Sequence, residues 1–150
     1  MEKEKQFKKN FIWNIFGTGF NAFNSLFFMI IATRINGVND AGIFTLAFST
    51  ACIIYVIGIY AGRIYQVTEP DKTISSKDYI ANRIITTILM MLAVIIFVIL
   101  RKYDILKSSV FILLTLYKAL EAFAEVFYGI LQKNEKLDIV GKSLFIKSLL

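Results

Sequence analysis

The sequence has no histidine, one cysteine and one proline among its 150 residues. Without histidine, no imidazole is available to bind a metal ion or to act as a general base. Cys52 has no second cysteine with which to form a disulfide or a zinc cluster, and we interpret it as a small packing residue. An HExxH metal motif, a paired-aspartate motif and a phosphate-cradling glycine loop are also missing. We therefore expect a protein that is not an enzyme and that uses no cofactor and no metal.

Apolar residues are abundant instead. They make up 57% of the chain, against about 45–50% in soluble domains. They gather in long blocks, each reaching the ~20 residues that a helix needs to cross a bilayer. The complete blocks are Phe11 to Ile35, Ala41 to Val67, Ile80 to Leu100 and Ser108 to Leu131, and a fifth begins near Ile139. The sequence predicts an all-α, polytopic membrane helix bundle in one domain, with four complete transmembrane helices and the start of a fifth.

Two other architectures fit the pattern poorly. A soluble bundle of such helices would leave large apolar surfaces in water. A membrane barrel would need shorter runs with period-two alternation, which these blocks lack. Helices satisfy their own backbone polar groups within lipid, so they are the favoured solution.

Basic residues predict how the helices are oriented. With a cytoplasmic amino terminus, eleven lysines and arginines lie on the inner side and four on the outer side. The inner set is Lys3, Lys5, Lys8, Lys9, Arg63, Lys72, Lys77, Arg83, Lys133, Lys136 and Lys142, and the outer set is Arg34, Arg101, Lys102 and Lys107. Membrane topology thus explains the net charge of +6, and we expect membrane lipids, not nucleic acid, as partners. The basic segment "MEKEKQFKKN" is interpreted as the start of a retained first helix, not as a cleaved signal.

The connections between blocks are short, which makes successive helices antiparallel neighbours. "NGVND", residues 36–40, is predicted to be a tight turn with Asn39 or Asp40 as the following cap. The next connection, residues 68–78, ends in three candidate cap residues, Ser75, Ser76 and Asp78.

The fourth block carries charges in its middle. At about 100° per residue, one stripe about 80° wide holds Lys118, Glu121, Glu125, Tyr128 and Gln132. A charge at mid-bilayer costs about 2.5–3.5 kcal/mol, so this stripe is expected to face protein or water. The opposite side is expected to meet lipid, and its residues are Leu116, Ala119, Phe123, Val126, Phe127 and Ile130.

Two interpretations of the stripe remain open. Lys118 and Glu121 can form an ion pair that serves as an interhelical clip, or the stripe can line a polar cavity. One lysine cannot neutralise both Glu121 and Glu125, which repel each other at i, i+4. The surplus carboxylate needs a partner, and the candidates are Arg34, Arg63, Arg83 or water.

The first and second blocks also have polar faces. The face of the first is formed by Asn14, Gly17, Thr18, Asn21, Asn24 and Ser25. Such small and amide side chains serve either close helix packing or a hydrophilic path. In the second block, Thr45, Ser49, Cys52 and Arg63 share a face. There Arg63 either extends to the membrane interface or contacts a ligand. Several helices thus direct polar faces towards one interior, and transport is the most economical function.

Three segments carry a family resemblance: "GRIYQVTE" from Gly62, "EAFAEVFYG" from Glu121 and "LQKNEKLDIVGKS" from Leu131. With their surroundings they resemble the amino-terminal part of bacterial polysaccharide flippases. These are the O-antigen and capsule exporters of the multidrug/oligosaccharidyl-lipid/polysaccharide export superfamily. The resemblance covers essentially the whole chain and implies a multi-pass protein of the bacterial cytoplasmic membrane.

The resemblance further implies movement of an undecaprenyl-pyrophosphate-linked oligosaccharide from the inner to the outer leaflet by alternating access, without ATP hydrolysis. Such a headgroup needs a water-filled, largely cationic route. Members of the family consist of two similar halves, so the resemblance implies that these residues are one part of a larger protein or assembly. Other polysaccharide-assembly proteins are possible partners.

The resemblance also implies roles for the candidate site residues. Arg34, Arg63, Arg83 and Lys118 are the candidates to meet the pyrophosphate. Asn14, Asn21 and Asn24 are candidates to exchange hydrogen bonds with sugar hydroxyls. Glu121 and Glu125 either hold the basic groups in place or bind a coupling cation or proton.

Three rival functions remain. A multidrug or cation antiporter of the same superfamily would also use membrane carboxylates. A membrane glycosyltransferase or polymerase would need a large loop outside the bilayer, which this part of the chain lacks. A non-transporting membrane assembly subunit would keep its function when the charged stripe of the fourth block is neutralised.

Overall fold

The computed structural model of the chain describes residues 2–69 and 74–149. Among these, the side chains of Glu2, Lys3, Ser25, Asn36, Val38 and Asn39 are not described. The predictions made above for the side chains of Ser25, Asn39, Lys3 and Lys72 therefore lie outside the described residues.

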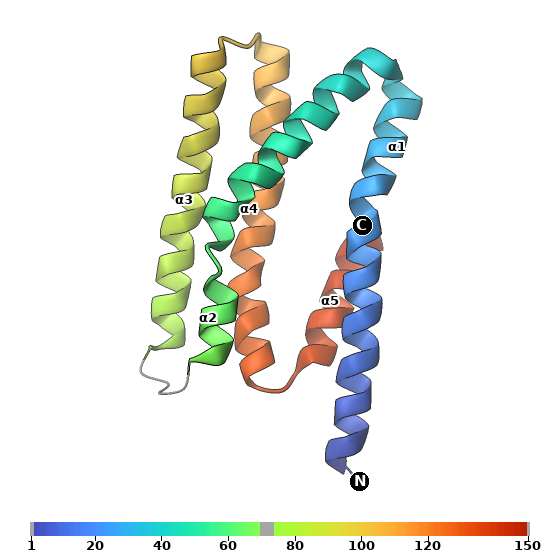
Figure 1. Cartoon of the computed structure of the whole chain (residues 1–150), viewed down its shortest axis with the longest axis vertical. Coiled ribbons are helices and arrows are strands. Elements are labelled where there is room, and N and C mark those ends of the chain that lie inside the picture. Colours follow the sequence, from blue (N-terminus) through green and yellow to red (C-terminus); the bar gives the residue numbers. More distant parts are fainter. Residues whose placement is uncertain (1, 70–73, 150) are drawn as a thin grey trace.

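The described chain is built from helices and contains no strand. In chain order they are α1 (Glu2–Ile59), α2 (Gly62–Thr68), α3 (Ser76–Arg101), α4 (Ile105–Lys133) and α5 (Leu137–Leu149). The predicted all-α fold is confirmed. Figure 1 shows that α1 rises from the amino terminus, bends and descends, after which α3 and α4 run up and down beside it. We call the end with the amino terminus and the α4–α5 turn the lower end, and the end with the bend and the α3–α4 turn the upper end.

Three helical segments are long and apolar enough to cross a membrane, which supports the membrane prediction. They are Glu4–Ile35, Asp40–Thr68 and Ser76–Arg101. Helix α4 has 29 residues, enough to span about 40 Å, but its three central charges set it apart from these segments. Large apolar side chains cover much of the outer surface, as lipid-facing helices require. Examples are Phe23, Ile96 and Leu113, which are 59%, 56% and 63% exposed.

The helices extend beyond their predicted limits at the ends. Helix α1 begins at Glu2 instead of Phe11, because lysine, glutamate and glutamine favour the helix and Lys8 pairs with Glu4 at 3.2 Å. Helix α3 begins with a capping box. The Ser75 hydroxyl accepts from the Lys77 amide at 3.3 Å, and the Asp78 carboxylate accepts from the Ser75 amide at 3.0 Å. The predicted cap residues Ser75 and Asp78 are confirmed.

The predicted turn at residues 36–40 is a bend inside α1. Gly37 has φ 79° and ψ 175°, while the residues on either side stay helical. Glycine adopts this conformation without the steric cost that a Cβ brings. A second helical segment follows this bend, and the predicted cap at Asp40 stays a prediction. The chain reverses its direction at the predicted place (Figure 1).

The second predicted block is broken, whereas the sequence predicted one continuous helix over Ala41 to Val67. Tyr60 and Ala61 have φ 37° and 48°, in the left-handed region, and α2 starts after them. The Gly58 carbonyl accepts hydrogen bonds from the Arg83 guanidinium and, at 3.0 Å, from the Thr86 hydroxyl. Backbone groups at a break inside an apolar bundle need such partners. Neither tyrosine nor alanine signals a break, which is why the prediction was wrong.

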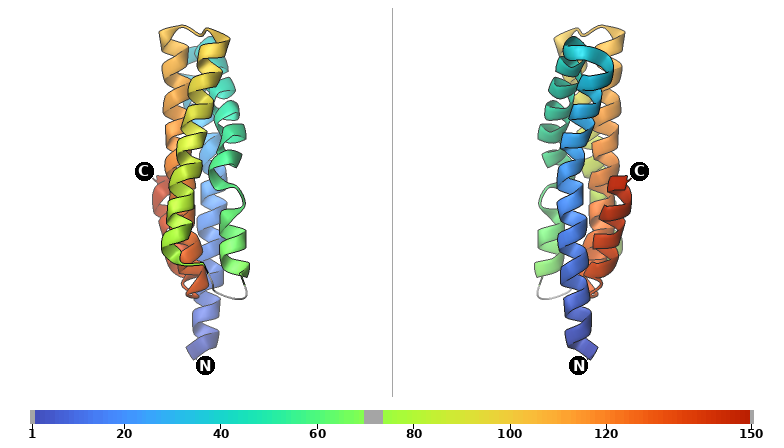
Figure 2. Two further views of the ribbon diagram at one scale, coloured as in Figure 1. Left: turned by 90° about the vertical axis from the view of Figure 1, so that its left-hand side faces the viewer. Right: turned by 90° about the vertical axis from the view of Figure 1, so that its right-hand side faces the viewer.

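Two packing contacts organise the bundle. The bend at Gly37 divides α1 into a first arm, before Gly37, and a second arm, from there to Ile59. The second arm joins α3 and α4 around a core of Ala47, Ile54, Met90, Val94, Val98, Phe111 and Ala119. The first arm of α1 packs on α5 through Gly17 and Gly141, so closely that a Cβ on Gly17 would lie 2.1 Å from the Gly141 carbonyl oxygen. Figure 2 shows the resulting elongated bundle, with the helices running along its length. Charged and amide side chains of α1, α4 and α5 lie between these two packed units.

Candidate functional site

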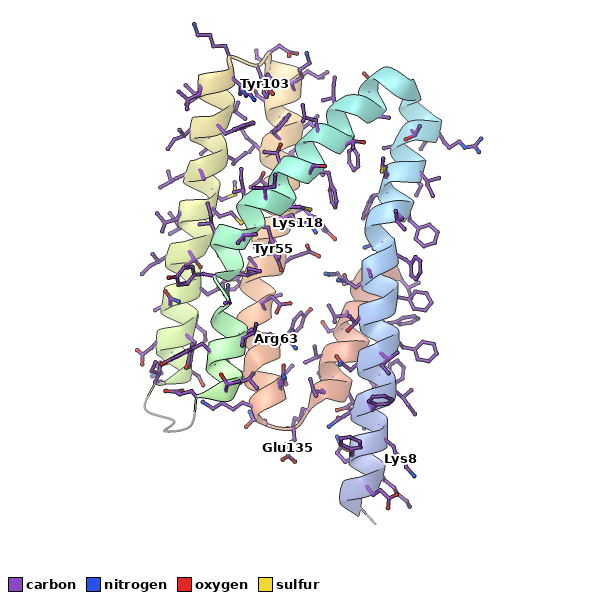
Figure 3. All side chains as sticks on the ribbon, viewed as in Figure 1. Lys8, Tyr55, Arg63, Tyr103, Lys118 and Glu135 are labelled. Carbon is purple, nitrogen blue, oxygen red and sulfur yellow. The ribbon has the colours of Figure 1, made fainter. Side chains whose placement is uncertain are left out.

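A cavity of about 470 Å³ opens between both arms of α1, α4 and α5, and we call it the central cavity. Its polar lining comprises Asn21, Asn24, Tyr55, Tyr117, Lys118, Glu121, Glu125, Tyr128 and Lys147. Figure 3 places Lys118 and Tyr55 near the middle of the bundle's height. The central cavity therefore gathers charged and aromatic side chains far from both ends of the helices.

Glu121 is the centre of an ion-pair network. Its carboxylate accepts from the Lys118 ammonium at 2.7 Å and from the Lys147 ammonium of α5 at 2.5 Å. The side chains of Lys118 and Glu121 are only 13% and 12% exposed. The predicted Lys118–Glu121 pair is confirmed, and it also lines the cavity. The interhelical contact comes from Lys147, a residue that the sequence analysis did not select although it is a lone charge in an apolar run.

Three aromatic rings surround the Lys118 ammonium. Its nitrogen lies 5.1 Å from the centroid of Phe48 and 5.6 Å from those of Tyr55 and Tyr117. Ring faces attract cations, and this attraction grows when water is excluded. The rings and Glu121 together stabilise a positive charge at this depth of the bundle.

Glu125 pairs with Arg63 of α2. The distance from Arg63 Nη1 to Glu125 Oε2 is 3.0 Å, and Arg63 Nε and Nη2 also donate to the Gln132 side-chain oxygen at 3.1 and 2.9 Å. The guanidinium carbon lies 5.8 Å from the centroid of the Tyr128 ring. Arg63 is therefore the partner of the surplus carboxylate, and it points into the bundle instead of simply extending to the interface.

The two other arginines of the predicted site lie elsewhere. The Arg83 guanidinium donates to the backbone at Gly58, and the residue is 4% exposed. Arg34 is exposed next to the bend of α1. Neither of them lines the central cavity.

A second cavity, of about 550 Å³, lies at the lower end between the start of α1, α2 and the α4–α5 turn. We call it the lower cavity. Its lining comprises Gln6, Phe7, Asn10, Phe11, Asn14, Val67, Gln132, Glu135 and Leu137. Asn14 thus lies here, whereas Asn21 and Asn24 line the central cavity. Gly17 of the same face packs against α5, so part of this face serves close helix packing, while its asparagines line the two cavities.

Polar contacts join α1 to the α4–α5 turn and to α5 beside this cavity. The Asn10 side chain donates to the Glu135 carbonyl at 2.7 Å and accepts from the Asp138 amide at 3.0 Å. The Asp138 carboxylate, 4% exposed as a residue, lies 2.9 Å from the Lys9 ammonium and 3.8 Å from that of Lys142. The hydrogen bond from Lys9 holds the pKa of Asp138 below its usual range, although burial acts in the opposite direction. These contacts attach the start of α1 to the start of α5.

The predicted stripe on α4 faces these two cavities. Lys118, Glu121, Glu125 and Tyr128 line the central cavity, and Gln132 lines the lower one. The prediction that the opposite side meets lipid is wrong in part. Ala119 and Val126 are 2% and 1% exposed, because the neighbouring helices cover them, whereas Leu116 and Phe127 are 43% and 42% exposed. Helix α4 is therefore buried on more of its circumference than its pattern indicated.

The charged residues that line the central cavity are two cations, Lys118 and Lys147, and two anions, Glu121 and Glu125, so their charges balance. Glu121 pairs with both lysines and Glu125 with Arg63, which lies outside the lining, so every carboxylate of the lining has a cationic partner. An anionic group can bind there by replacing a carboxylate as partner of the lysines. The amides and tyrosine hydroxyls add neutral donors and acceptors.

No protein-family model, no curated protein and no solved structure matches the chain.

Proposed function

We propose that the chain forms part of a flippase that moves a lipid-linked, pyrophosphate-bearing oligosaccharide across the bacterial cytoplasmic membrane. The single observation that carries the proposal is the central cavity, in which paired charges lie at mid-helix depth between spans. In this proposal α4 also spans the membrane, with its charged stripe turned inwards. The lower end faces the cytoplasm.

The two lysines of the central cavity support an anionic cargo. Lys118 and Lys147 share one carboxylate, and each ammonium has three donors, so both retain hydrogen-bonding capacity for phosphate oxygens. The proposal therefore assigns the pyrophosphate to Lys118, Lys147 and Arg63. Arg83 is assigned to the helix break, where it donates to the Gly58 carbonyl.

The neutral lining supports a sugar headgroup. Asn21 and Asn24 offer amide donors and acceptors, and the rings of Tyr55, Tyr117 and Tyr128 offer flat apolar faces beside hydroxyls. A polyprenyl tail would remain among the exposed apolar side chains on the outside of α1, while the headgroup passes between the helices. Alternating access of this kind places the binding site near the bilayer midplane.

The test is complementation of a strain that lacks the complete gene. We expect Glu121→Gln and Lys118→Ala each to reduce surface polysaccharide by at least about tenfold, as loss of one strong charge-assisted contact does. Lipid-linked oligosaccharide would accumulate on the cytoplasmic side, while the amount of protein in the membrane stays unchanged. The matched control is Lys107→Ala, which removes an exposed lysine at the upper end. Normal glycan display in both cavity variants would contradict the proposal and favour a non-transporting assembly subunit.

A second candidate is a cation antiporter, favoured by the aromatic enclosure of the Lys118 ammonium and by Glu125. An organic cation that takes the place of the Lys118 ammonium would contact the same three rings, those of Phe48, Tyr55 and Tyr117. This function predicts proton- or sodium-driven efflux of small organic cations. The efflux is expected to be lost in Glu125→Gln, while polysaccharide display stays normal.

A further inference from the structure

The two cavities share no lining residue, yet one side chain connects their walls. Arg63 contacts Glu125, which lines the central cavity, and Gln132, which lines the lower cavity. Arg63 itself lines neither cavity. Its guanidinium therefore lies in the layer that separates them.

The same layer continues on both sides of Arg63. The guanidinium lies over the ring of Tyr128, and the Tyr128 hydroxyl is 3.1 Å from the Ser143 hydroxyl of α5. On α1, Gly17 falls between Asn14 of the lower cavity and Asn21 of the central cavity, and it packs directly on α5. Side chains from α2, α4 and α5 thus close the bundle at one height.

We propose that Arg63 is a gate between the lower and the central cavity, and that it opens by movement of α2. The inference rests on the proposed function for the idea that a polar headgroup enters from the lower end. When the guanidinium leaves Glu125 and Gln132, the two cavities join into one path. Three asparagines of α1, Asn14, Asn21 and Asn24, then follow that path from one end to the other.

The helix break gives the gate a pivot. Helix α2 has seven residues and follows Tyr60 and Ala61, whose left-handed conformations separate it from α1. Arg83 and Thr86 hold the last turn before the break through the Gly58 carbonyl, so this side of the pivot is fixed. Changes in φ and ψ at a few such residues are how hinges absorb motion.

The gate contact is also accessible enough to be exchanged. The side chains of Arg63 and Glu125 are 25% and 24% exposed, about twice the exposure of the Lys118–Glu121 pair. A partly exposed ion pair is weaker than a buried one, because water screens it. The arrangement thus combines a firm network at Glu121 with a weaker contact at the gate.

The experiment measures how fast a cysteine in the central cavity reacts with a membrane-impermeant maleimide. Inside-out vesicles expose the lower end of the full chain to the reagent, and Cys52→Ser removes the native thiol. The reporter is Ala124→Cys in the wall of the central cavity. We expect Arg63→Ala to raise its rate of modification about tenfold, a change that corresponds to losing about 1.4 kcal/mol of closed-state preference. Glu125→Gln, which removes the same ion pair, is expected to do so as well.

Three controls define the outcome. Phe7→Cys in the lower cavity is expected to react at the same rate with and without Arg63. Arg101→Ala, which removes an exposed arginine at the upper end, is expected to leave the Ala124→Cys rate unchanged. The exchanged pair, Arg63→Glu with Glu125→Arg, is expected to restore slow modification.

The gate would be overturned if maleimide modified Ala124→Cys at the same rate, fast or slow, with Arg63 and with Arg63→Ala. If Arg63→Ala fails to reach the membrane, the rate in Glu125→Gln decides in its place. The measurement needs no transported substrate, so it separates two failures. If Arg63→Ala speeds the modification of Ala124→Cys while the Glu121 and Lys118 variants display normal polysaccharide, the gate is supported and the flippase is rejected. If Arg63→Ala leaves the rate unchanged while the Glu121 and Lys118 variants lose polysaccharide display, only the gate is rejected.

Discussion

Glu121 illustrates how a single residue makes charge tolerable inside an apolar bundle. One carboxylate receives two ammonium groups, one from its own helix and one from α5. Removing one member of such a pair leaves the other unpaired, and for buried pairs this costs about 3–5 kcal/mol. The network therefore links the rotation of α4 to the position of α5.

A double-mutant cycle between Glu121→Gln and Lys147→Met tests this link. We expect a coupling free energy of about 1–3 kcal/mol in unfolding measured in detergent, because the two side chains are in direct contact. The matched pair is Asp104→Asn with Lys107→Met, whose side chains are 58% and 45% exposed. There we expect a coupling below about 0.5 kcal/mol. Equal coupling in the two pairs would contradict the network.

Asp138 gives a pH prediction at the same scale. Its pKa is lower in the folded chain than in the unfolded chain, where it is about 3.9. Its contribution to stability is therefore complete above the unfolded pKa and is lost as the pH falls through the folded value. We expect wild type to be more stable than Asp138→Asn at pH 6 and this advantage to shrink below about pH 4. Thermal unfolding of both proteins across that range is the measurement, and a constant difference would contradict the assignment.

The elements owe their arrangement to a few backbone features. Gly37 reverses α1, the left-handed Tyr60 and Ala61 separate α2, and the capping box of Ser75 starts α3. Arg83 then repairs the break by donating to Gly58. The capping box and Arg83 satisfy backbone groups that lipid would leave without partners.

The contact between α1 and α5 predicts a strong effect from a single methyl group. In Gly141→Ala, the new Cβ would lie 2.1 Å from the Trp13 carbonyl oxygen and 2.7 Å from the Asn14 amide nitrogen, so the helices must separate. We expect a loss of about 1–3 kcal/mol in the free energy of unfolding, as for other overpacked sites. Gly19→Ala is the control, because its Cβ would meet nothing within 4 Å. Equal stability of the two variants would show that the close approach is not needed.

At the scale of the whole molecule, the bundle has polar ends, an apolar core and a polar central cavity inside an apolar surface. At the lower end the contacts of Asn10 and Asp138 join α1 to the α4–α5 turn and α5, and the upper end holds the α3–α4 turn. Figure 3 places Tyr103 and Glu135 at these opposite ends. The proposed orientation follows if α4 crosses the membrane between them.

Cysteine labelling of the two ends of α4 tests that orientation. In a Cys52→Ser background, we expect Asp104→Cys to react with an impermeant maleimide on intact cells. Asn134→Cys is expected to react only after the membrane is opened. Both residues are exposed at the caps of α4 and are thus comparable in local accessibility. Labelling of both positions on intact cells would contradict a membrane-spanning α4.

Much of the site could be predicted because the charged stripe of α4 has to face protein or water, which fixes how this helix is rotated about its axis. Lys118, Glu121 and Glu125 were selected from spacing alone, and all three line the central cavity. Lys147 was missed because its partner lies 26 residues away, on another helix. The break at Tyr60 was missed because no residue type there disfavours a helix strongly. Gly58 and Gly62 on either side were the available signal.

The order of residues is thus enough to specify helices, their approximate limits and the inward stripe of α4, because a bilayer tolerates neither open backbone nor unpaired charge. Packing in three dimensions selected the partners. The contacts of Arg63 with Glu125 and Gln132 join residues 62 and 69 positions apart. Such pairs depend on how helices are placed and rotated against each other, and local periodicity carries no information about that.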